Sequence, residues 1–153
     1  DMPGVTEPML YFGTARSVFA LHTEDMDLYS LNYHHEGHPK VWYGIPCDEA
    51  PRVRSIAGSL YAEQNHECSQ FLRHKNTLIS PRKLVKHGIN VCRLVQCAGE
   101  FVITWPAAFH LGFNTGTNIA EATNFATIEW IPAGLTAKRC GCRHDAVRVD
   151  VLD

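Results

Sequence analysis

The sequence predicts a mostly β domain of the jelly-roll type, in which a helical insertion separates two groups of strands. Segments rich in aromatic and β-branched residues, separated by short polar turns, occupy both ends of the chain. Between them the apolar residues recur with a helical period instead. No repeat, low-complexity segment or linker divides the 153 residues, so we expect a single domain over 1–153.

The first group of predicted strands fills the N-terminal part of the chain. Its members are Met9 to Gly13, Ser17 to Thr23, Leu28 to Glu36 and Lys40 to Ile45. The second group follows the insertion. Its members are Val91 to Gln96, Glu100 to Trp105, Phe109 to Asn114 and Ile119 to Ala126. In a jelly roll, strands from the two groups can meet across one closed β-structure.

Two helices are predicted between these groups. The first begins near Asp48, a candidate cap, and presents one apolar stripe. That stripe consists of Val53, Ile56, Ala57, Leu60 and Tyr61. For the second helix, Ser80 suits the cap, Pro81 the first helical position and Gly88 the residue just past the end.

Composition limits the possible functions. The net charge is −2, and no charge run indicates a nucleic-acid-binding surface, so no direct sequence-specific nucleic-acid binding is predicted. No apolar stretch approaches the ~18 residues that cross a bilayer, and no leader is apparent. We therefore expect a soluble chain without a membrane partner, and its start at Asp1 suggests a fragment.

Six cysteines are irregularly spaced, and the last two form a Cys-x-Cys pair. They are Cys47, Cys68, Cys92, Cys97, Cys140 and Cys142. With no secretory signal, this pattern favours metal binding in a reducing compartment over disulfides.

A His-x-Glu pair and one distant histidine are the candidate metal ligands. Alternate side chains of a strand leave the same face, so His22 and Glu24 can converge while Thr23 points away. With His110 they would form the facial triad typical of non-heme Fe(II) oxygenases, which leaves coordination positions open. The same pair on a strand is also common on solvated surfaces, so the short motif alone leaves both interpretations open.

A long ordered series of segments surrounds these ligands. It comprises 19–33, 37–43, 71–75, Gly99-Glu100-Phe101, His110-x-Gly112-Phe113-Asn114 and Glu121-x-Thr123-Asn124-Phe125-Ala126. The series closely resembles the JmjC-domain histone lysine demethylases, above all the KDM-four (JMJD-two) subfamily. The resemblance implies a cupin-like double-stranded β-helix. It also implies that 1–153 is a single JmjC catalytic domain without its N-terminal JmjN portion.

By this resemblance, His22, Glu24 and His110 bind Fe(II) and leave three positions, two for 2-oxoglutarate and one for O2. Lys40 would pair with the distal carboxylate of 2-oxoglutarate, since a buried dicarboxylate needs a cation. Without the family, Lys40 reads as a solvated edge charge. The other implied contacts to 2-oxoglutarate are the polar Asn32 and Thr104 and the aromatic walls Phe19 and Trp42, which would otherwise read as core residues.

The implied reaction is oxidative N-demethylation. As 2-oxoglutarate is decarboxylated to succinate, an N-methyl group is hydroxylated and the carbinolamine releases formaldehyde. Because nitrogen needs no lone pair, trimethyl-lysine can react. The residues matching the family's methyl-lysine pocket are Gly4, Tyr11, Glu24, Ala122 and Asn124. Tyr11 could equally be an ordinary strand residue, and Asn124 could make a turn or cross-strand hydrogen bond.

A second metal site has its own support. Three thiolates and one imidazole form the ligand set of a closed structural zinc site. This chain offers Cys68, His74, Cys140 and Cys142, which match the zinc ligands typical of the subfamily. Zinc would join the helical insertion to the C-terminal segment and contribute to folding. Cys47, Cys92 and Cys97 are expected to be buried thiols, although Cys92 and Cys97 could form a separate pair.

The chain also departs from the family pattern. Met9 and Phe109 replace tyrosines, and Ala107-Ala108-Phe109-His110-Leu111 replaces a Tyr-Gly-Tyr-His-Ala style sequence. Ala122 stands where several relatives have serine. These changes touch substrate fit and leave the metal ligands intact, so the preferred methylation state and target lysine stay open.

The leading hypothesis is a nuclear demethylase of di- and trimethyl-lysine on the histone H3 tail in chromatin, at lysine 9 or lysine 36. The first alternative is a protein hydroxylase with the same iron chemistry. The second is a catalytically silent methyl-lysine-binding chromatin module, against which the intact triad argues.

Overall fold

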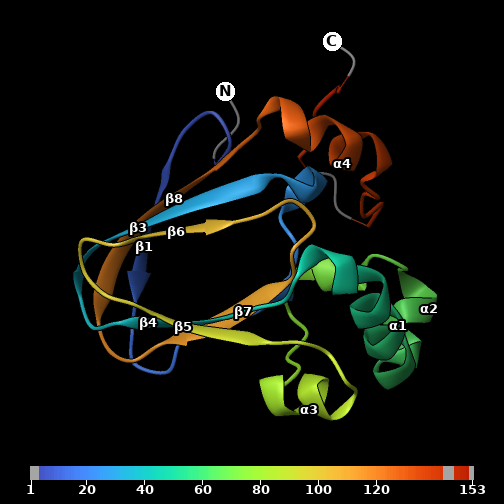
Figure 1. The fold of residues 1–153 in the computed structure, drawn as a ribbon, viewed down its shortest axis with the longest axis horizontal. Helices are drawn as coiled ribbons and strands as arrows, with labels where there is room; N and C mark the ends of the chain where they lie inside the picture. The colour runs from blue at the N-terminus through green and yellow to red at the C-terminus, as the bar shows by residue number, and fades with distance from the viewer. Residues whose placement is uncertain (1–3, 143–146, 152–153) are drawn as a thin grey trace.

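The computed structural model describes residues 4–142 and 147–151, and two four-stranded antiparallel sheets form its body (Figure 1). The first sheet has the order β1 (Met9–Gly13), β8 (Asn118–Phe125), β3 (Tyr29–Gly37), β6 (Phe101–Thr104). The second has the order β2 (Val18–His22), β7 (His110–Asn114), β4 (Lys40–Gly44), β5 (Cys92–Gln96). Each sheet combines strands from before and after the insertion, so the predicted jelly roll is confirmed.

The helical insertion lies at one end of the two sheets, on the right in Figure 1. It consists of α1 (Ala50–Leu60), α2 (Ala62–Glu67) and α3 (Pro81–Lys86). A further helix, α4 (Ile131–Thr136), follows the last strand and was not predicted, since its six residues include Pro, Gly and Thr. Among the described residues, no helix has both the length and the apolar character that crossing a membrane requires.

The predicted cap of the second helix is confirmed and that of the first is wrong. Ser80 Oγ accepts a hydrogen bond from the Lys83 amide, and Gly88 adopts φ +77° one residue beyond the C-cap of α3. Asp48 instead lies in a 3₁₀ turn over Cys47–Glu49, and Glu49 occupies the cap position of α1 without a side-chain cap. This extra turn lies between the end of β4 at Gly44 and the start of α1 at Ala50, and the apolar stripe that predicted the helix does not extend into it.

The main core lies between α1, α3 and the second sheet. Leu21 of β2 and Leu111 of β7 point into it, whereas their neighbours His22 and His110 face the opposite side. The other buried members are Ile45, Ala50, Val53, Ala57, Phe71, Leu72, Ile79, Leu84, Ile89 and Phe109. A fully buried side chain such as Val53 contributes roughly 1.5–3 kcal/mol. This packing therefore holds β2 and β7 with both histidines facing the space between the sheets.

Three cysteines outside the metal pattern correct an expectation. Cys47, Cys92 and Cys97 are free and exposed rather than buried. Cys92 belongs to β5, the edge strand of its sheet, whose side chains are mostly solvent-accessible. An edge strand with one uncovered face exposes residues that an interior strand would bury.

Candidate active site

Two histidines and one carboxylate converge at the end of the sheet pair, as the sequence predicted. His22 and His110 are direct partners in the β2–β7 ladder, and their rings lie 4.4 Å apart between centroids. Glu24 Oε1 is 3.2 Å from His110 Nε2 and 3.8 Å from His22 Nε2. One ligand atom from each of the three residues lies within 4.8 Å of the other two, a geometry that could hold a metal ion.

A register shift in β2 allows this convergence. The β2–β7 pairing is regular at Val18 and Phe19 and shifts between Phe19 and His22. With strict alternation, residues three apart would face opposite sides of the sheet, yet both Phe19 and His22 line the same cavity. Such an irregularity re-aims a side chain, as bulges near active sites commonly do.

Hydrogen bonds orient both imidazoles toward the metal position. His22 Nδ1–H donates to Ala20 O at 2.7 Å, and His110 Nδ1–H donates to Ala108 O at 3.1 Å. Each Nε2 therefore remains available as a ligand. These bonds leave the two histidines with the tautomer that metal binding requires.

The electrostatics of the triad also suit a metal. Burial, together with the neighbouring His110, lowers the pKa of His22 to about 3, so its imidazole is neutral near pH 7. Burial opposes the ionisation of Glu24, but the hydrogen bond and charge of His110 outweigh it and lower the pKa of Glu24. A neutral imidazole at His22 and an ionised carboxylate at Glu24 are the protonation states in which these groups bind a divalent cation.

The triad opens into a cavity of about 290 Å³ between the sheets. Besides the triad, it is lined by most residues that the sequence assigned to 2-oxoglutarate or methyl-lysine. These are Phe19, Asn32, Lys40, Trp42, Gly4, Tyr11, Ala122 and Asn124. Thr104 does not line it. Thr104 pairs with the lining residue Ser30, and its Oγ1 is buried without a hydrogen-bond partner among the described residues.

Lys40 is the buried cation of this cavity. The residue is 6% exposed, and Nζ donates a 2.6 Å hydrogen bond to Asn114 Oδ1. Nζ also lies 5.9 Å from the centroid of the Phe19 ring. Burial lowers the pKa of Lys40, and no carboxylate in the described part of the chain forms an ion pair with it. A buried ammonium without a counter-ion fits an anionic ligand.

A hydrogen-bond chain fixes the far wall of the cavity. Trp42 Nε1 donates to Gln96 Oε1 at 2.8 Å, and Gln96 Nε2 donates to Asn32 Oδ1 at 3.1 Å. Trp42 in turn packs edge-on against Phe19, with ring centroids 4.7 Å apart. Because Trp42 and Asn32 belong to different sheets, the fully buried Gln96 connects the two sheets at this point. Gln96 was not among the residues predicted from the sequence.

The residues matched to methyl-lysine line the same cavity. Asn124 Nδ2 donates to Tyr29 O across the strands, as one sequence interpretation allowed, and the Asn124 amide donates to Gly4 O. Tyr11 is half-exposed, and burial together with the charge of Glu24 raises its pKa. Ala122 pairs with Asn32 in the first sheet. These residues therefore line the same cavity as Glu24.

Lys75 and Asp25 also line the cavity and were not singled out from the sequence. The charge of Lys75 contributes to lowering the pKa of both His22 and Glu24. Lys75 has a left-handed backbone at φ 58°, directly after His74. Lys75 ends the segment 71–75 that carries the family resemblance, and this position was the sequence feature that could have marked it as a site residue.

The four predicted zinc ligands also converge, which supports a second metal centre. His74 Nε2 is 3.1 Å from Cys140 Sγ, and Cys68 Sγ is 3.6 Å from the same sulfur. Cys142 completes a group whose ligand atoms lie within 4.8 Å of one another. Burial raises the pKa of Cys140, but hydrogen bonds from the Cys142 amide and from His74 outweigh it and lower that pKa to about 7. A thiol that ionises near neutrality is a suitable zinc ligand.

The sheets, the triad and the cavity define an oxygenase-type domain of the jelly-roll class, and residues 9–125 match the family described as JmjC domain, hydroxylase. The chain belongs to this JmjC family. It is 51% identical over 148 residues to the mouse (Mus musculus) lysine-specific demethylase 4B. The aligned residues cover 97% of this chain and 14% of that protein.

Two further relatives are similarly close. The chain is 51% identical over 139 residues to the human (Homo sapiens) probable lysine-specific demethylase 4F, covering 91% of this chain and 22% of the relative. It is 50% identical over 139 residues to lysine-specific demethylase 4D of Rattus norvegicus, covering 91% of this chain and 27% of the relative. The resemblance to the KDM-four group is confirmed, and the chain spans 14–27% of the length of these three proteins.

Proposed function

We propose that this JmjC domain catalyses Fe(II)- and 2-oxoglutarate-dependent demethylation of di- and trimethyl-lysine. One observation carries the proposal: the His22, Glu24 and His110 ligand atoms converge in a cavity that also holds the buried cation Lys40, which forms no ion pair within the described residues. A facial triad leaves coordination positions open for a co-substrate. The lysine-specific demethylases that are 50–51% identical to this chain over the aligned residues make methyl-lysine the favoured substrate.

The residues that line the cavity would then have distinct roles. His22, Glu24 and His110 would hold Fe(II), which supplies the oxidation of the methyl group when O2 and 2-oxoglutarate are bound. Lys40 would bind the distal carboxylate of 2-oxoglutarate by a charge-assisted hydrogen bond. Phe19 and Trp42 would exclude water on one side of it.

Asn32 and Thr104 remain proposed contacts of 2-oxoglutarate. Asn32 already lies in the cavity, held by Gln96. Thr104 lies on the neighbouring strand opposite Ser30, and its buried Oγ1, which has no hydrogen-bond partner among the described residues, is the atom that would contact the co-substrate.

The methyl-lysine would enter from the side opposite Lys40. Gly4, Tyr11, Glu24, Ala122 and Asn124 would surround its methylammonium group. Oxygens and an aromatic face attract polarised methyl groups, and the Tyr11 ring and Glu24 supply both. The domain would thereby position a methyl carbon close to the metal, and this positioning is its main contribution to the rate.

We further propose that Cys68, His74, Cys140 and Cys142 bind a structural zinc ion. Three thiolates and one imidazole leave no position for substrate. The substrate protein would be the histone H3 tail, at lysine 9 or lysine 36, which implies a nuclear location on chromatin. Met9 lines the cavity and is the residue expected to alter that choice, whereas Phe109, which precedes His110, is buried in the core outside the cavity.

The test is incubation of the protein with Fe(II), 2-oxoglutarate and histone H3 peptides carrying di- or trimethyl-lysine at position 9 or 36. We expect loss of methyl mass, with formaldehyde and succinate formed in equal amounts. A stable hydroxylated peptide without formaldehyde would favour a protein hydroxylase. Binding of methylated peptide with no consumption of 2-oxoglutarate would favour a silent methyl-lysine-binding module. Either result would overturn the demethylase proposal.

A further inference from the structure

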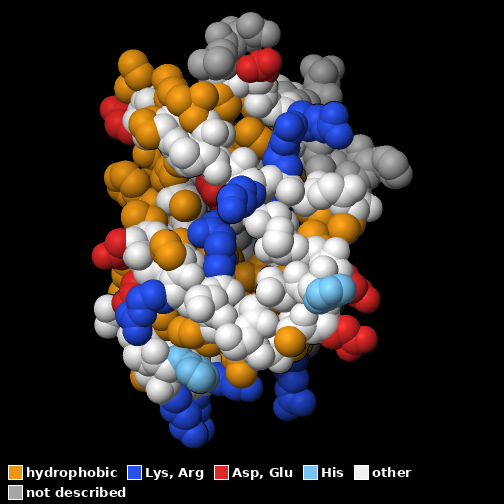
Figure 2. Space-filling model, turned by 90° about the vertical axis from the view of Figure 1, so that its right-hand side faces the viewer, with side chains coloured by type: hydrophobic (Ala, Val, Ile, Leu, Met, Phe, Trp, Pro, Cys, Tyr) orange, Lys and Arg blue, Asp and Glu red, His pale blue; other side chains and the backbone are white. Residues whose placement is uncertain are grey.

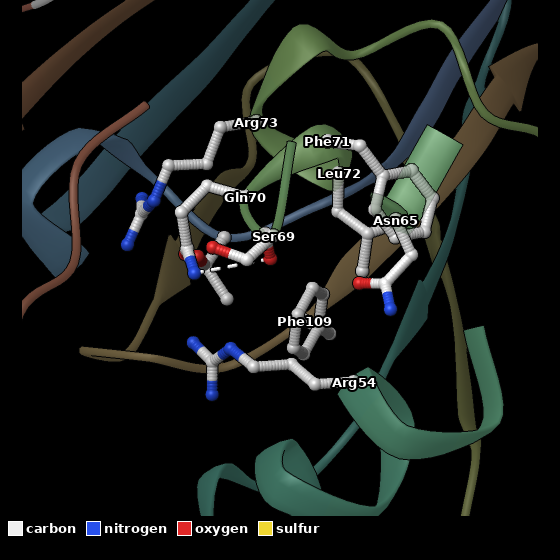
Figure 3. Close-up of a pocket in the computed structure, with 9 residues that line it drawn as sticks. Arg54, Asn65, Ser69, Gln70, Phe71, Leu72, Arg73 and Phe109 are labelled. Carbon is white, nitrogen blue, oxygen red and sulfur yellow. Dashed lines mark hydrogen bonds between the residues drawn. The ribbon is translucent and has the colours of Figure 1, made fainter. Parts of the chain in front are cut away.

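A second, smaller pocket lies behind the iron-ligand strands, and we call it the rear pocket. Its volume is about 50 Å³. Since a single water needs roughly 10–15 Å³, the pocket can hold a few waters or one small oxyanion. Figure 3 shows its walls. The lining residues are Thr23, Arg54, Asn65, Ser69, Gln70, Phe71, Leu72, Arg73 and Phe109.

The rear pocket is built from neighbours of both metal groups. Thr23 lies between the triad members His22 and Glu24, and Phe109 precedes His110. Alternation sends these two side chains away from the iron cavity. The segment 69–73 joins the zinc-group residues Cys68 and His74. A ligand in the rear pocket would therefore contact segments that carry ligands of each metal.

Arg54 brings an unpaired positive charge to this pocket. Its guanidinium carbon lies 5.1 Å from the centroid of the Phe109 ring, and the side chain is only partly exposed. Burial lowers the pKa of Arg54, the charge of Arg73 lowers it further, and Asp27 opposes both. Within residues 4–142 and 147–151, no carboxylate forms an ion pair with Arg54.

Arg73 supplies a buried donor that is still free. The residue is 9% exposed, and its Nη1 and Nη2 donate to Glu24 O and Asp27 Oδ1. Its Nε is buried and has no hydrogen-bond partner among the described residues. A buried N–H left without an acceptor is costly, and native structures seldom tolerate one. An acceptor atom from a ligand would satisfy it.

We propose that the rear pocket binds one small oxyanion, a carboxylate or phosphate group, between Arg54 and Arg73. The two guanidinium groups face a single carboxylate, that of Asp27, so one positive charge is left for the ligand. In Figure 3 both groups lie on the same side of the pocket, with the Gln70 amide between them in this view. Arginine is well suited to carboxylate and phosphate because its N–H groups match their oxygens.

The surroundings agree with an anionic ligand from solution. Asn65 and Ser69 are exposed, so the rear pocket opens to solvent. Figure 2 shows Lys and Arg side chains down the middle of the face that carries α1 and α4, while acidic side chains lie mostly toward its edges. Such a distribution attracts anions to this face. The proposal does not depend on the demethylase activity.

The test is a titration of the ¹⁵N-labelled chain, observed by NMR at the arginine Nε–H groups. Sodium phosphate and sodium acetate are added separately, with chloride replaced to keep the ionic strength constant. We expect saturable shifts of the Arg54 and Arg73 signals with at least one anion. Arg54→Gln should weaken binding about tenfold, because it removes a charged hydrogen-bond donor. Arg82→Gln, which removes an exposed arginine of α3, should leave the affinity unchanged.

The two anions identify the ligand class. Saturation with phosphate alone supports a phosphate site, saturation with acetate alone a carboxylate site, and saturation with both a general oxyanion site. Absence of saturable shifts with either anion would overturn the proposal. So would undiminished binding in Arg54→Gln, whose zinc content reports whether the variant folds. If Arg54→Gln does not fold, the proposal is tested by the titration of the unaltered chain and by the anion affinity of Arg54→Lys.

Discussion

Arg73 Nη1 donates a 2.7 Å hydrogen bond to the backbone oxygen of Glu24, the residue that supplies the carboxylate of the triad. Its Nη2 donates to Asp27 Oδ1 at 2.9 Å. Arg73 directly precedes the zinc-group residue His74, so one buried guanidinium connects the backbone of one metal group to that of the other. The turn Asp25–Asp27, which follows Glu24 and includes two residues with positive φ, is thereby held from outside the sheets.

Removal of the Arg73 side-chain charge should destabilise the fold. Arg73→Gln leaves the Asp27 carboxylate buried and unpaired, and both side chains of this ion pair are 8% exposed. We expect a loss of about 3–5 kcal/mol in the free energy of unfolding, measured in urea. The control Arg52→Gln breaks the more exposed pair with Glu49 and should cost under ~1 kcal/mol. Equal losses in the two variants would contradict the structural role of Arg73.

His22→Ala should separate the two metal groups. The imidazole of His22 is a proposed iron ligand and lies apart from the cysteine cluster. We expect Fe(II) binding and 2-oxoglutarate turnover to disappear, while metal analysis finds the zinc content unchanged. Loss of zinc from this variant would show that the two ligand sets have been confused.

Lys40→Gln should weaken the binding of 2-oxoglutarate. The substitution keeps a hydrogen-bonding side chain toward Asn114 and removes the buried charge. Loss of one charge-assisted contact corresponds to roughly 10–100-fold in the dissociation constant, which calorimetry can measure. Lys86→Gln, on the exposed end of α3, is the matched control. A change of less than about twofold in Lys40→Gln would refute the assigned role.

Removal of the proposed zinc ion should lower the melting temperature. Structural zinc contributes folding free energy directly, so a chelator or Cys140→Ser should destabilise the chain and release zinc. Cys97→Ser replaces an exposed free thiol and should change neither zinc content nor melting temperature. A chelator-treated chain that melts unchanged would rule out a structural metal at Cys68, His74, Cys140 and Cys142.

His34 should make the stability of the fold acid-sensitive. His34 is fully buried in β3, and burial lowers its pKa below the ordinary 6.5. The charge of Lys40 adds to this effect, whereas the hydrogen bond to the backbone oxygen of Glu36 and the charge of Glu100 oppose it. The unfolded chain therefore binds a proton that the folded chain does not. The unfolding free energy should be highest above pH 6.5 and fall as the pH drops below that value, by up to about 1.4 kcal/mol per pH unit for this one group.

His34→Gln should reduce that slope, measured by denaturation between pH 7 and pH 5. The control His66→Gln replaces an exposed histidine of α2 and should leave the slope as it is. A slope that is identical in the unaltered chain and in His34→Gln would assign the acid sensitivity to other groups.

Local features of the fold were readable from the sequence. The strand at Lys40–Gly44 and the capped helix at Pro81–Lys86 depend on short-range propensity, capping and turn chemistry, and both were predicted nearly to the residue. The triad and the group of three cysteines and one histidine were found by residue type and resemblance. Two predictions were wrong. Cys47, Cys92 and Cys97 were expected to be buried but are exposed, because burial depends on strand order, and Asp48 does not cap α1, because an extra 3₁₀ turn precedes that helix.

By itself, then, the sequence determined which strands form, which candidate metal ligands they carry and which family the chain resembles. Only the tertiary structure decided where those groups point. The register shift that brings Phe19 and His22 into one cavity, the bond from Lys40 to Asn114 and the bond from Arg73 to Glu24 depend on strand pairing and packing. Their partners lie 74 and 49 residues apart, and no local propensity encodes such a contact, because it exists only once both sheets have closed around the core.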